Sequence, residues 1–171
     1  MPIDYSQSGY KEMFANYGLT VIAALSLEKS LLLLTSAIGN LSNGSLPKEK
    51  LHEYLESSQS KPPMKKKTMG SLVNEVKMRI NIPASLETDL EKAKEMRNHI
   101  IHHFFMDEYE TLSLETGAIV LSNKLRPVRD FFLVVQSEVD RLLLVFCSEL
   151  RKPKNEIGQE VRRMLKGKWA I

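Results

Sequence analysis

The sequence has a single cysteine, Cys147, so no disulfide can form within the chain. A lone thiol fits a reducing compartment. Basic residues exceed acidic ones by only three, which permits contact with a phosphate backbone but does not by itself predict it. Glycine-rich phosphate-binding loops and the glycine-flanked turn of a nucleophilic serine are also missing. These absences argue against P-loop enzymes and against nucleophilic triads.

A basic start followed by an apolar run is missing from residues 1–18, so we expect no signal peptide. The most apolar stretch, residues 19–39, carries Glu28 and Lys29 at its centre. Charges at that position would strongly penalise a membrane-spanning helix. We therefore interpret the stretch as a core helix of a cytoplasmic protein without a membrane anchor.

Alternating strand patterns are missing too, whereas apolar residues spaced three and four apart occur along most of the chain. We expect a loose segment at 1–9 and one helical domain at 10–171. The three long helices are expected at about 10–38, 85–107 and 118–150, with shorter ones at 48–58, 68–80 and 156–171. This content predicts an all-α fold, an antiparallel up-and-down four-helix bundle with additional short helices.

One helix places a charge on its apolar side. On a helical wheel, Arg97 falls among the apolar residues Leu86, Leu90, Ala93, Ile100, Ile101 and Phe104. An arginine cannot lose its proton there, and an unpaired buried charge costs several kcal/mol. Arg97 therefore needs a carboxylate partner, an open cleft, or both.

Glu28 occupies a similar place in the first long helix. Apolar residues surround it on the wheel: Val21, Ala24, Leu25, Leu31 and Leu32. We predict that Glu28 pairs with Arg97 across the two helices. Two alternatives remain: the pair only fixes the register of the helices, or Glu28 reaches solvent.

Three histidines crowd onto the helix of Arg97. Asn98 and His102 are four residues apart and share one edge beside the apolar side, while His99 and His103 form a second such pair nearer to solvent. The spacing of His99 and His103 would suit zinc, but the chain has no H-E-x-x-H pattern, and His52 is the only other histidine. We expect no metal site and no cofactor.

Arg97, Asn98 and His102 together suit phosphate chemistry. Arginine holds phosphate and stabilises developing negative charge, histidine transfers protons near neutral pH, and asparagine can orient either group. Those are the needs of RNA cleavage by a 2′-hydroxyl that attacks the adjacent phosphate, a reaction that needs no metal.

The segment "RNHIIH" (97–102) resembles the motif of the HEPN superfamily, an arginine and a polar residue followed after three residues by histidine. The following "HFF" (103–105), the acid inside "LSLEKSLLLL" (25–34) and the long last helix are also similar to that family. The resemblance covers about residues 10–150.

The resemblance implies a four-helix bundle that forms homodimers and acts as a metal-independent endoribonuclease, in many members as a toxin or defence enzyme with a possible antitoxin partner. Arg97 and His102 would be the catalytic pair and Asn98 the supporting polar residue. His103 would help to hold RNA, and so would the lysines at 65–67 (Lys65, Lys66 and Lys67), on the basis of charge alone.

One subgroup of the family has a tyrosine two positions after the motif histidine, which a partner nucleotidyltransferase modifies. Phe104 stands there, which argues against that form of neutralisation but not against an antitoxin that acts by binding. Two rival hypotheses remain: a non-catalytic HEPN-like dimer that binds a partner protein or nucleotide, and a helical scaffold that uses the Arg97–Glu28 pair as a register lock.

Overall fold

The described part of the chain is helical. The computed structural model describes residues 8–43, 67–150, 152 and 154–167. Within them every element is a helix, and the one β-type contact is an isolated antiparallel bridge between Ile80 and Leu165. The predicted all-α class is therefore confirmed. The loose segment expected before Ser8, the helix expected at 48–58 and two of the lysines, Lys65 and Lys66, lie outside the described residues.

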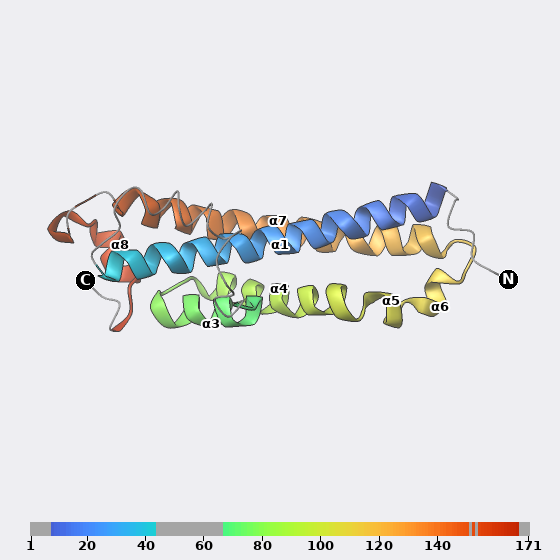
Figure 1. Cartoon of the computed structure of the whole chain (residues 1–171), viewed down its shortest axis with the longest axis horizontal. Helices are drawn as coiled ribbons and strands as arrows, with labels where there is room; N and C mark the ends of the chain where they lie inside the picture. The colour runs from blue at the N-terminus through green and yellow to red at the C-terminus, as the bar shows by residue number, and fades with distance from the viewer. Residues whose placement is uncertain (1–7, 44–66, 151, 153, 168–171) are drawn as a thin grey trace, which may run out of the picture.

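Three long helices dominate the structure (Figure 1): α1 (Ser8–Asn43), α4 (Ala84–His102) and α7 (Gly117–Glu149). The side-chain amide of Asn16 donates to Oγ of Ser122 (2.7 Å), and the hydroxyl of Thr20 donates to the carbonyl of Leu125 (3.4 Å). Residue numbers rise together along both helices, so α1 and α7 run parallel. Figure 1 shows α4 running in the opposite direction.

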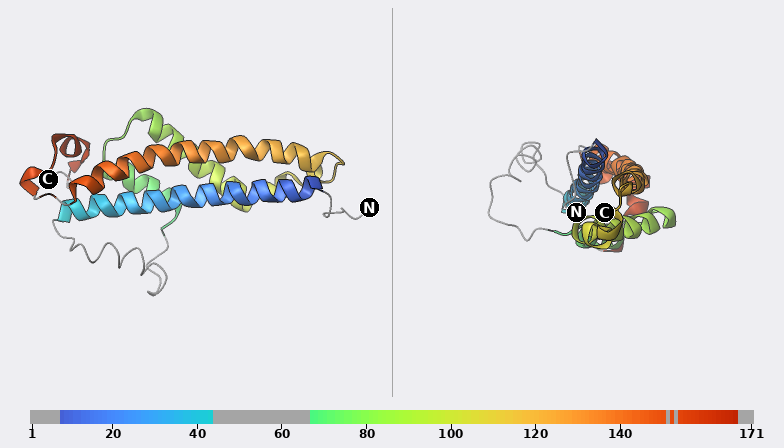
Figure 2. Two further views of the ribbon diagram at one scale, coloured as in Figure 1. Left: turned by 90° about the horizontal axis from the view of Figure 1, so that it is seen from above. Right: turned by 90° about the vertical axis from the view of Figure 1, so that its right-hand side faces the viewer.

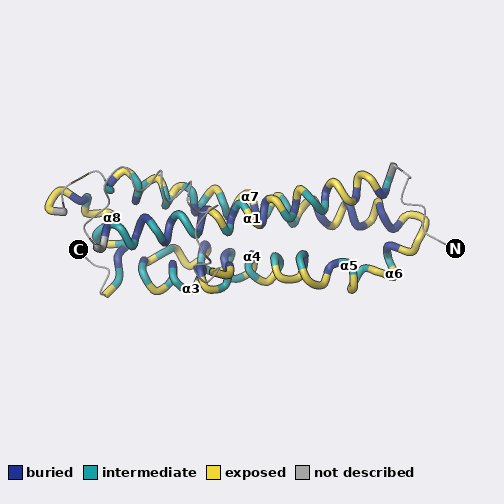
Figure 3. Tube along the Cα trace, in the orientation of Figure 1, coloured by how far each residue is buried: buried dark blue, intermediate teal, exposed yellow. Residues whose placement is uncertain are grey.

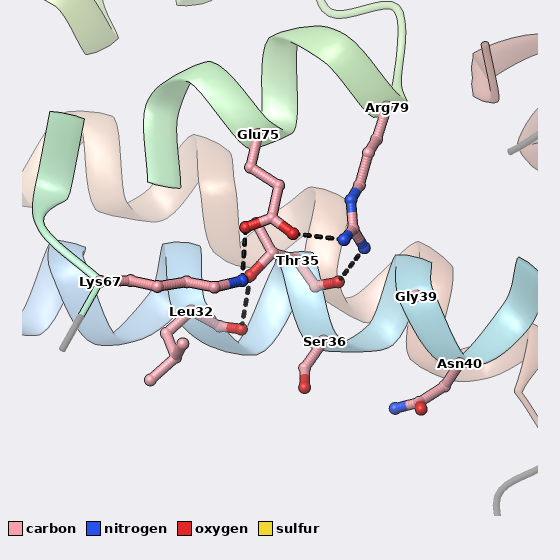
Figure 4. Close-up of a pocket in the computed structure, with 8 residues that line it drawn as sticks. All are labelled: Leu32, Thr35, Ser36, Gly39, Asn40, Lys67, Glu75 and Arg79. Atoms are coloured by element: carbon pink, nitrogen blue, oxygen red, sulfur yellow. Dashed lines mark hydrogen bonds and ion pairs between the residues drawn. The ribbon is translucent and has the colours of Figure 1, made fainter. Parts of the chain in front are cut away.

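Shorter helices complete the described fold: α3 (Met69–Arg79), α5 (Phe104–Asp107), α6 (Tyr109–Leu112), the 3₁₀ turn η1 (Lys154–Glu156) and α8 (Gln159–Met164). The molecule is elongated, and α3 to α6 lie along one side of the α1–α7 pair (Figures 1 and 2). Successive helices α3, α4 and α7 alternate in direction. By contrast, α3 runs the same way as α1, with Lys67 beside Leu32 and Arg79 beside Gly39 (Figure 4).

The predicted boundaries agree with the structure better for the last long helix than for the first. The helix expected at 118–150 is α7, and Pro127 lies inside it. The helix expected to stop before Gly39 continues to Asn43. Gly39 therefore does not end the helix. The packing of Arg79 explains this glycine, because a Cβ on it would lie only 3.0 Å from Nη1 of Arg79.

The prediction of one continuous helix over 85–107 is wrong. α4 ends at His102, and His103 adopts φ −126° and ψ −23° before α5 begins at Phe104. This break turns Phe104 into a small core cluster at the end of the bundle, where it packs with Tyr10, Met13 and Leu112. Burial of that ring offsets the interrupted backbone hydrogen bonding.

Two apolar clusters fill the interior. The main cluster joins α1, α3, α4 and α7 and includes Leu31, Ala93 and Phe132, while the smaller one includes Ile100 and Phe104. Figure 3 shows the buried stripes of the long helices facing one another. On α4, Ala93 belongs to the first cluster and Ile100 to the second, so Arg97 stands at the junction between them.

α1 is apolar nearly all round. Among the described helices it alone is long and apolar enough to cross a membrane by length and composition, over Gly9–Leu41, and half of its most apolar window is buried inside the molecule. A core helix of a soluble protein passes the same test. Length and composition therefore do not separate the two cases.

Candidate functional site

Arg97 points from α4 towards α1. Its neighbours on the same side of α4, Ala93 and Ile100, are buried, as the helical wheel predicts. The Arg97 side chain is itself only 19% exposed. The sequence therefore folds so that a permanent positive charge lies at the edge of an apolar interface.

The predicted partner of Arg97 is confirmed. Nη2 of Arg97 donates to Oε2 of Glu28 across 3.3 Å, and each of the two side chains is 19% exposed. A second bond links Nη1 of Arg97 to the Asn98 side-chain oxygen across 3.4 Å. In the described part of the chain, the buried Nε–H of Arg97 has no acceptor. A single long hydrogen bond thus joins the pair, which is partly exposed to solvent.

Asn98 and His102 lie on the exposed edge of α4, one helical turn apart. The rings of His102 and His103 lie edge to face with their centroids 6.3 Å apart. Arg97 and His102 are five residues apart, which separates their directions by about 140° on a helix. The Arg97–Asn98 bond is therefore the contact that connects the guanidinium to the edge carrying His102.

His99 belongs to a different set of contacts. Its Nδ1 lies 3.4 Å from Oδ2 of Asp107, and its ring meets the ring of Phe104 edge to face at 6.4 Å. His99 thus turns towards α5 and away from the arginine, as expected. No group of three or more histidine, cysteine or acidic side chains gathers closely enough for a metal ion within the described ranges, and His52 falls outside them.

Tyr17 is a residue of the site that the sequence did not reveal. Its hydroxyl donates to the carbonyl oxygen of Ile100 across 3.1 Å. Its ring packs against Phe104 and Phe105, with centroid separations of 5.6 and 4.7 Å. Tyr17 therefore fixes the last turn of α4, which carries His102, to the neighbouring helix. The one signal that could have suggested this role of Tyr17 is its position on the side of α1 that faces α4.

A polar pocket of about 190 Å³ lies between α1 and α3 (Figure 4). Nζ of Lys67 lies 2.6 Å from Glu75, and Glu75 also pairs with Arg79. Nη1 of Arg79 donates to the carbonyl of Thr35 (3.0 Å). Lys67, the one lysine of the predicted RNA-binding run within the described residues, is therefore neutralised by a carboxylate.

The pocket and the ion pair are neighbours along α1. Leu32, which lines the pocket, follows Glu28 by four residues, or about 6 Å of helix. Within the pocket, Glu75 already pairs with both cations, Lys67 and Arg79.

The site has a polar edge on α4, an arginine set behind that edge, and no close metal-ligand cluster in the described residues. The arginine and the polar edge suit the binding of an anion beside a histidine. Comparisons of the chain with models of protein families, with curated proteins and with solved structures found no match.

Proposed function

We propose that the chain is a HEPN-type, metal-independent endoribonuclease. In this proposal Arg97 and His102 are the catalytic residues, and Asn98 holds the guanidinium towards the edge of α4. In this proposal the described helices belong to the helical bundle of that family. Helix α4 runs opposite to α1 and α7, which supports antiparallel packing in part, whereas α1 and α7 themselves run parallel. The protein acts in the cytoplasm, and Glu28 and Lys29 at the centre of α1 support a location outside the membrane.

The poor pairing of Arg97 is the observation that carries the proposal. A register lock would favour a bidentate, fully satisfied arginine–carboxylate pair. Arg97 instead makes a single 3.3 Å contact with Glu28 and keeps an unpaired, buried Nε–H in the described part of the chain. A charge held in this way costs stability, which favours a role in function over a role in packing.

The reaction forms a bond between the 2′-oxygen and phosphorus and breaks the bond from phosphorus to the 5′-oxygen. His102 takes the proton from the 2′-hydroxyl, and the partner subunit's His102, protonated at the start of the step, gives a proton to the leaving 5′-oxygen. Arg97 stabilises the added negative charge on the phosphate oxygens. The products are a 2′,3′-cyclic phosphate and a 5′-hydroxyl.

A single motif offers one arginine and one histidine. Two copies would provide a groove with convergent positive charge and a second proton-transfer group, so we propose a two-fold homodimer with Asn98 and His102 near its interface. An antitoxin protein that covers this groove is the expected regulatory partner.

The test is incubation of the purified protein with structured and unstructured RNA, with and without EDTA, followed by analysis of the product ends. His102→Ala and Arg97→Ala should each reduce cleavage by about 10²–10⁴-fold. His99→Ala is the matched control, because His99 contacts Asp107 instead of the arginine, and it should retain activity. Cleavage that survives His102→Ala, or that EDTA abolishes, would refute the mechanism.

The second candidate is a non-catalytic HEPN-like dimer that binds a nucleotide or a partner protein. The pocket beside Arg79 and Lys67 favours it, since it is polar and lies one turn from Glu28. Isothermal titration with mononucleotides would distinguish the two candidates: binding without cleavage of any RNA, lost in Arg79→Met, supports the second.

A further inference from the structure

Two phenylalanines follow the break in α4, and the apolar core explains only the first of them. Phe104 is 4% exposed and packs inside the small cluster, whereas Phe105 is only partly buried at the edge of that cluster. The Phe105 ring lies against two rings of α1, with its centroid 4.7 Å from that of Tyr17 and 6.0 Å from that of Phe14. Phe14, Tyr17 and Phe105 thus form a set of adjoining rings, the aromatic platform.

The aromatic platform is held in place and yet partly exposed. The Tyr17 hydroxyl donates to the carbonyl of Ile100 across 3.1 Å, and the Phe105 ring meets the ring of Phe104 edge to face at 5.2 Å. Phe14 nevertheless keeps 42% of its surface exposed. Rings that are already fixed lose little conformational entropy when a ligand packs on them. The platform therefore suits a flat ligand with an apolar surface.

The aromatic platform adjoins the proposed catalytic residues. Phe105 follows His102 by three residues, so their Cα atoms lie at most about 11 Å apart. Arg97 precedes Phe105 by eight residues, which corresponds to about 12 Å along a helix. A short stretch of unpaired RNA strand can span these distances. A ligand on the platform and a phosphate at Arg97 can therefore belong to the same strand.

The charges on the helices of the aromatic platform suit RNA. No acidic residue occurs in the sequence between Glu95 and Asp107, and that interval carries one arginine and three histidines. On α1, no charged residue occurs between Glu12 and Glu28, and Glu28 itself pairs with Arg97. A polyanion that passes the platform on its way to Arg97 therefore meets no carboxylate from either interval, which favours its approach.

We propose that the aromatic platform is a base-binding subsite of the ribonuclease, and here the inference rests on the proposed function. One unpaired base of the RNA lies on the rings of Phe105 and Phe14, while a neighbouring phosphate is held at Arg97 and His102. Aromatic stacking beside a positively charged contact to the backbone is how many proteins hold single strands. A purine has a larger ring surface than a pyrimidine, so the subsite favours cleavage next to adenine or guanine.

Fluorescence titration of the full chain tests the subsite without cleavage. The probe is a single-stranded uridine oligomer with one central 2-aminopurine, made with 2′-fluoro sugars that lack the attacking hydroxyl. The wild-type protein should quench the 2-aminopurine, because that base stacks on the platform. The double variant Phe14→Leu with Phe105→Leu should bind the oligomer about 10–100-fold more weakly and without quenching. The dependence of log Kd on log salt concentration should not change, because the phosphate contacts remain.

Phe131→Leu is the matched control. Phe131 is also partly buried, but it lies on α7, where Nζ of Lys92 is 4.7 Å from its ring centroid. This variant should keep both the affinity and the quenching, and so should Phe105→Tyr, which retains the ring. Circular dichroism checks the helix content of every variant. If the double variant does not fold, Phe14→Leu alone decides the test, because its position is 42% exposed, and it should reduce the quenching.

The possible outcomes separate the subsite from the proposed function. Equal affinity and quenching in wild type and in the folded leucine variants would overturn the subsite, and RNA cleavage lost in His102→Ala would then still support the ribonuclease. Quenching that depends on the platform, in a protein that cleaves no RNA, would support the base-binding site and overturn the proposed function alone. A wild-type protein that does not bind the oligomer would overturn the subsite.

Discussion

Replacing Glu28 by alanine should destabilise the fold by about 2 kcal/mol. Removing one partner from a fully buried ion pair costs about 3–5 kcal/mol, and an exposed pair contributes about 0.2–1 kcal/mol. The Arg97–Glu28 pair lies between these limits, because both side chains are 19% exposed and a single 3.3 Å contact joins them. For a chain of this length the loss corresponds to a fall of about 4–8 °C in Tm.

Glu12→Ala is the matched control. Glu12 also lies on α1 and also pairs with an arginine, Arg126, but its side chain is 58% exposed. Both variants place alanine in the same helix, so the change in helix propensity cancels. We expect Glu12→Ala to cost less than about 1 kcal/mol. Urea unfolding followed at 222 nm, at one fixed protomer concentration, measures both free energies of unfolding.

The double variant Glu28→Leu with Arg97→Met tests whether the stability lost in Glu28→Ala comes from the unpaired charge of Arg97. Apolar replacement of both charges should restore most of the stability lost in Glu28→Ala, because no unpaired charge remains. Equal free energies of unfolding for Glu28→Ala and Glu12→Ala would refute the reasoning that partial burial makes the Glu28 pair more costly to break than the exposed Glu12 pair.

Three further changes have outcomes that the structure determines. Gly117→Ala should lower Tm by several degrees in a thermal melt, because the new Cβ would lie 1.8 Å from the carbonyl oxygen of Thr111. A hydrogen bond from Lys152 and, to a smaller extent, one from the Gly158 amide lower the pKa of Glu149 in the folded protein. The ionised carboxylate therefore stabilises the fold at pH values above its ordinary pKa, and this stabilisation is lost as the pH falls through the lower pKa of the folded state. The difference in urea stability between wild type and Glu149→Gln should therefore shrink below about pH 4. Burial raises the pKa of Cys147, so a thiol reagent should modify the native protein far more slowly at pH 7 than the unfolded chain.

The pairing of Arg97 with Glu28 could be predicted from the sequence because each charge interrupts an apolar stripe. Burial leaves such charges few solutions, and an opposite charge on a facing helix is the simplest. The class of the fold follows from the same periodicity. Both predictions depend on patterns that repeat along one helix.

Features set by contacts between distant segments could not be predicted. The break at His103 depends on a site for Phe104 beside Tyr10, and the role of Tyr17 depends on which carbonyl lies opposite its hydroxyl. Gly39 looked like a helix end because nothing near it in sequence indicates the guanidinium of Arg79. Local propensity carries no information on these neighbours.

The packing of α1 on α7, a helix far away in the sequence, also determines the order in which the protein can fold during synthesis. The first helix is complete at Asn43, and its main partner begins only at Gly117. At about 5–20 residues per second, a ribosome takes roughly 4–15 s to make the chain between them. Throughout that delay a 36-residue apolar helix has no cover from its partner. A chain truncated before α7 should therefore aggregate.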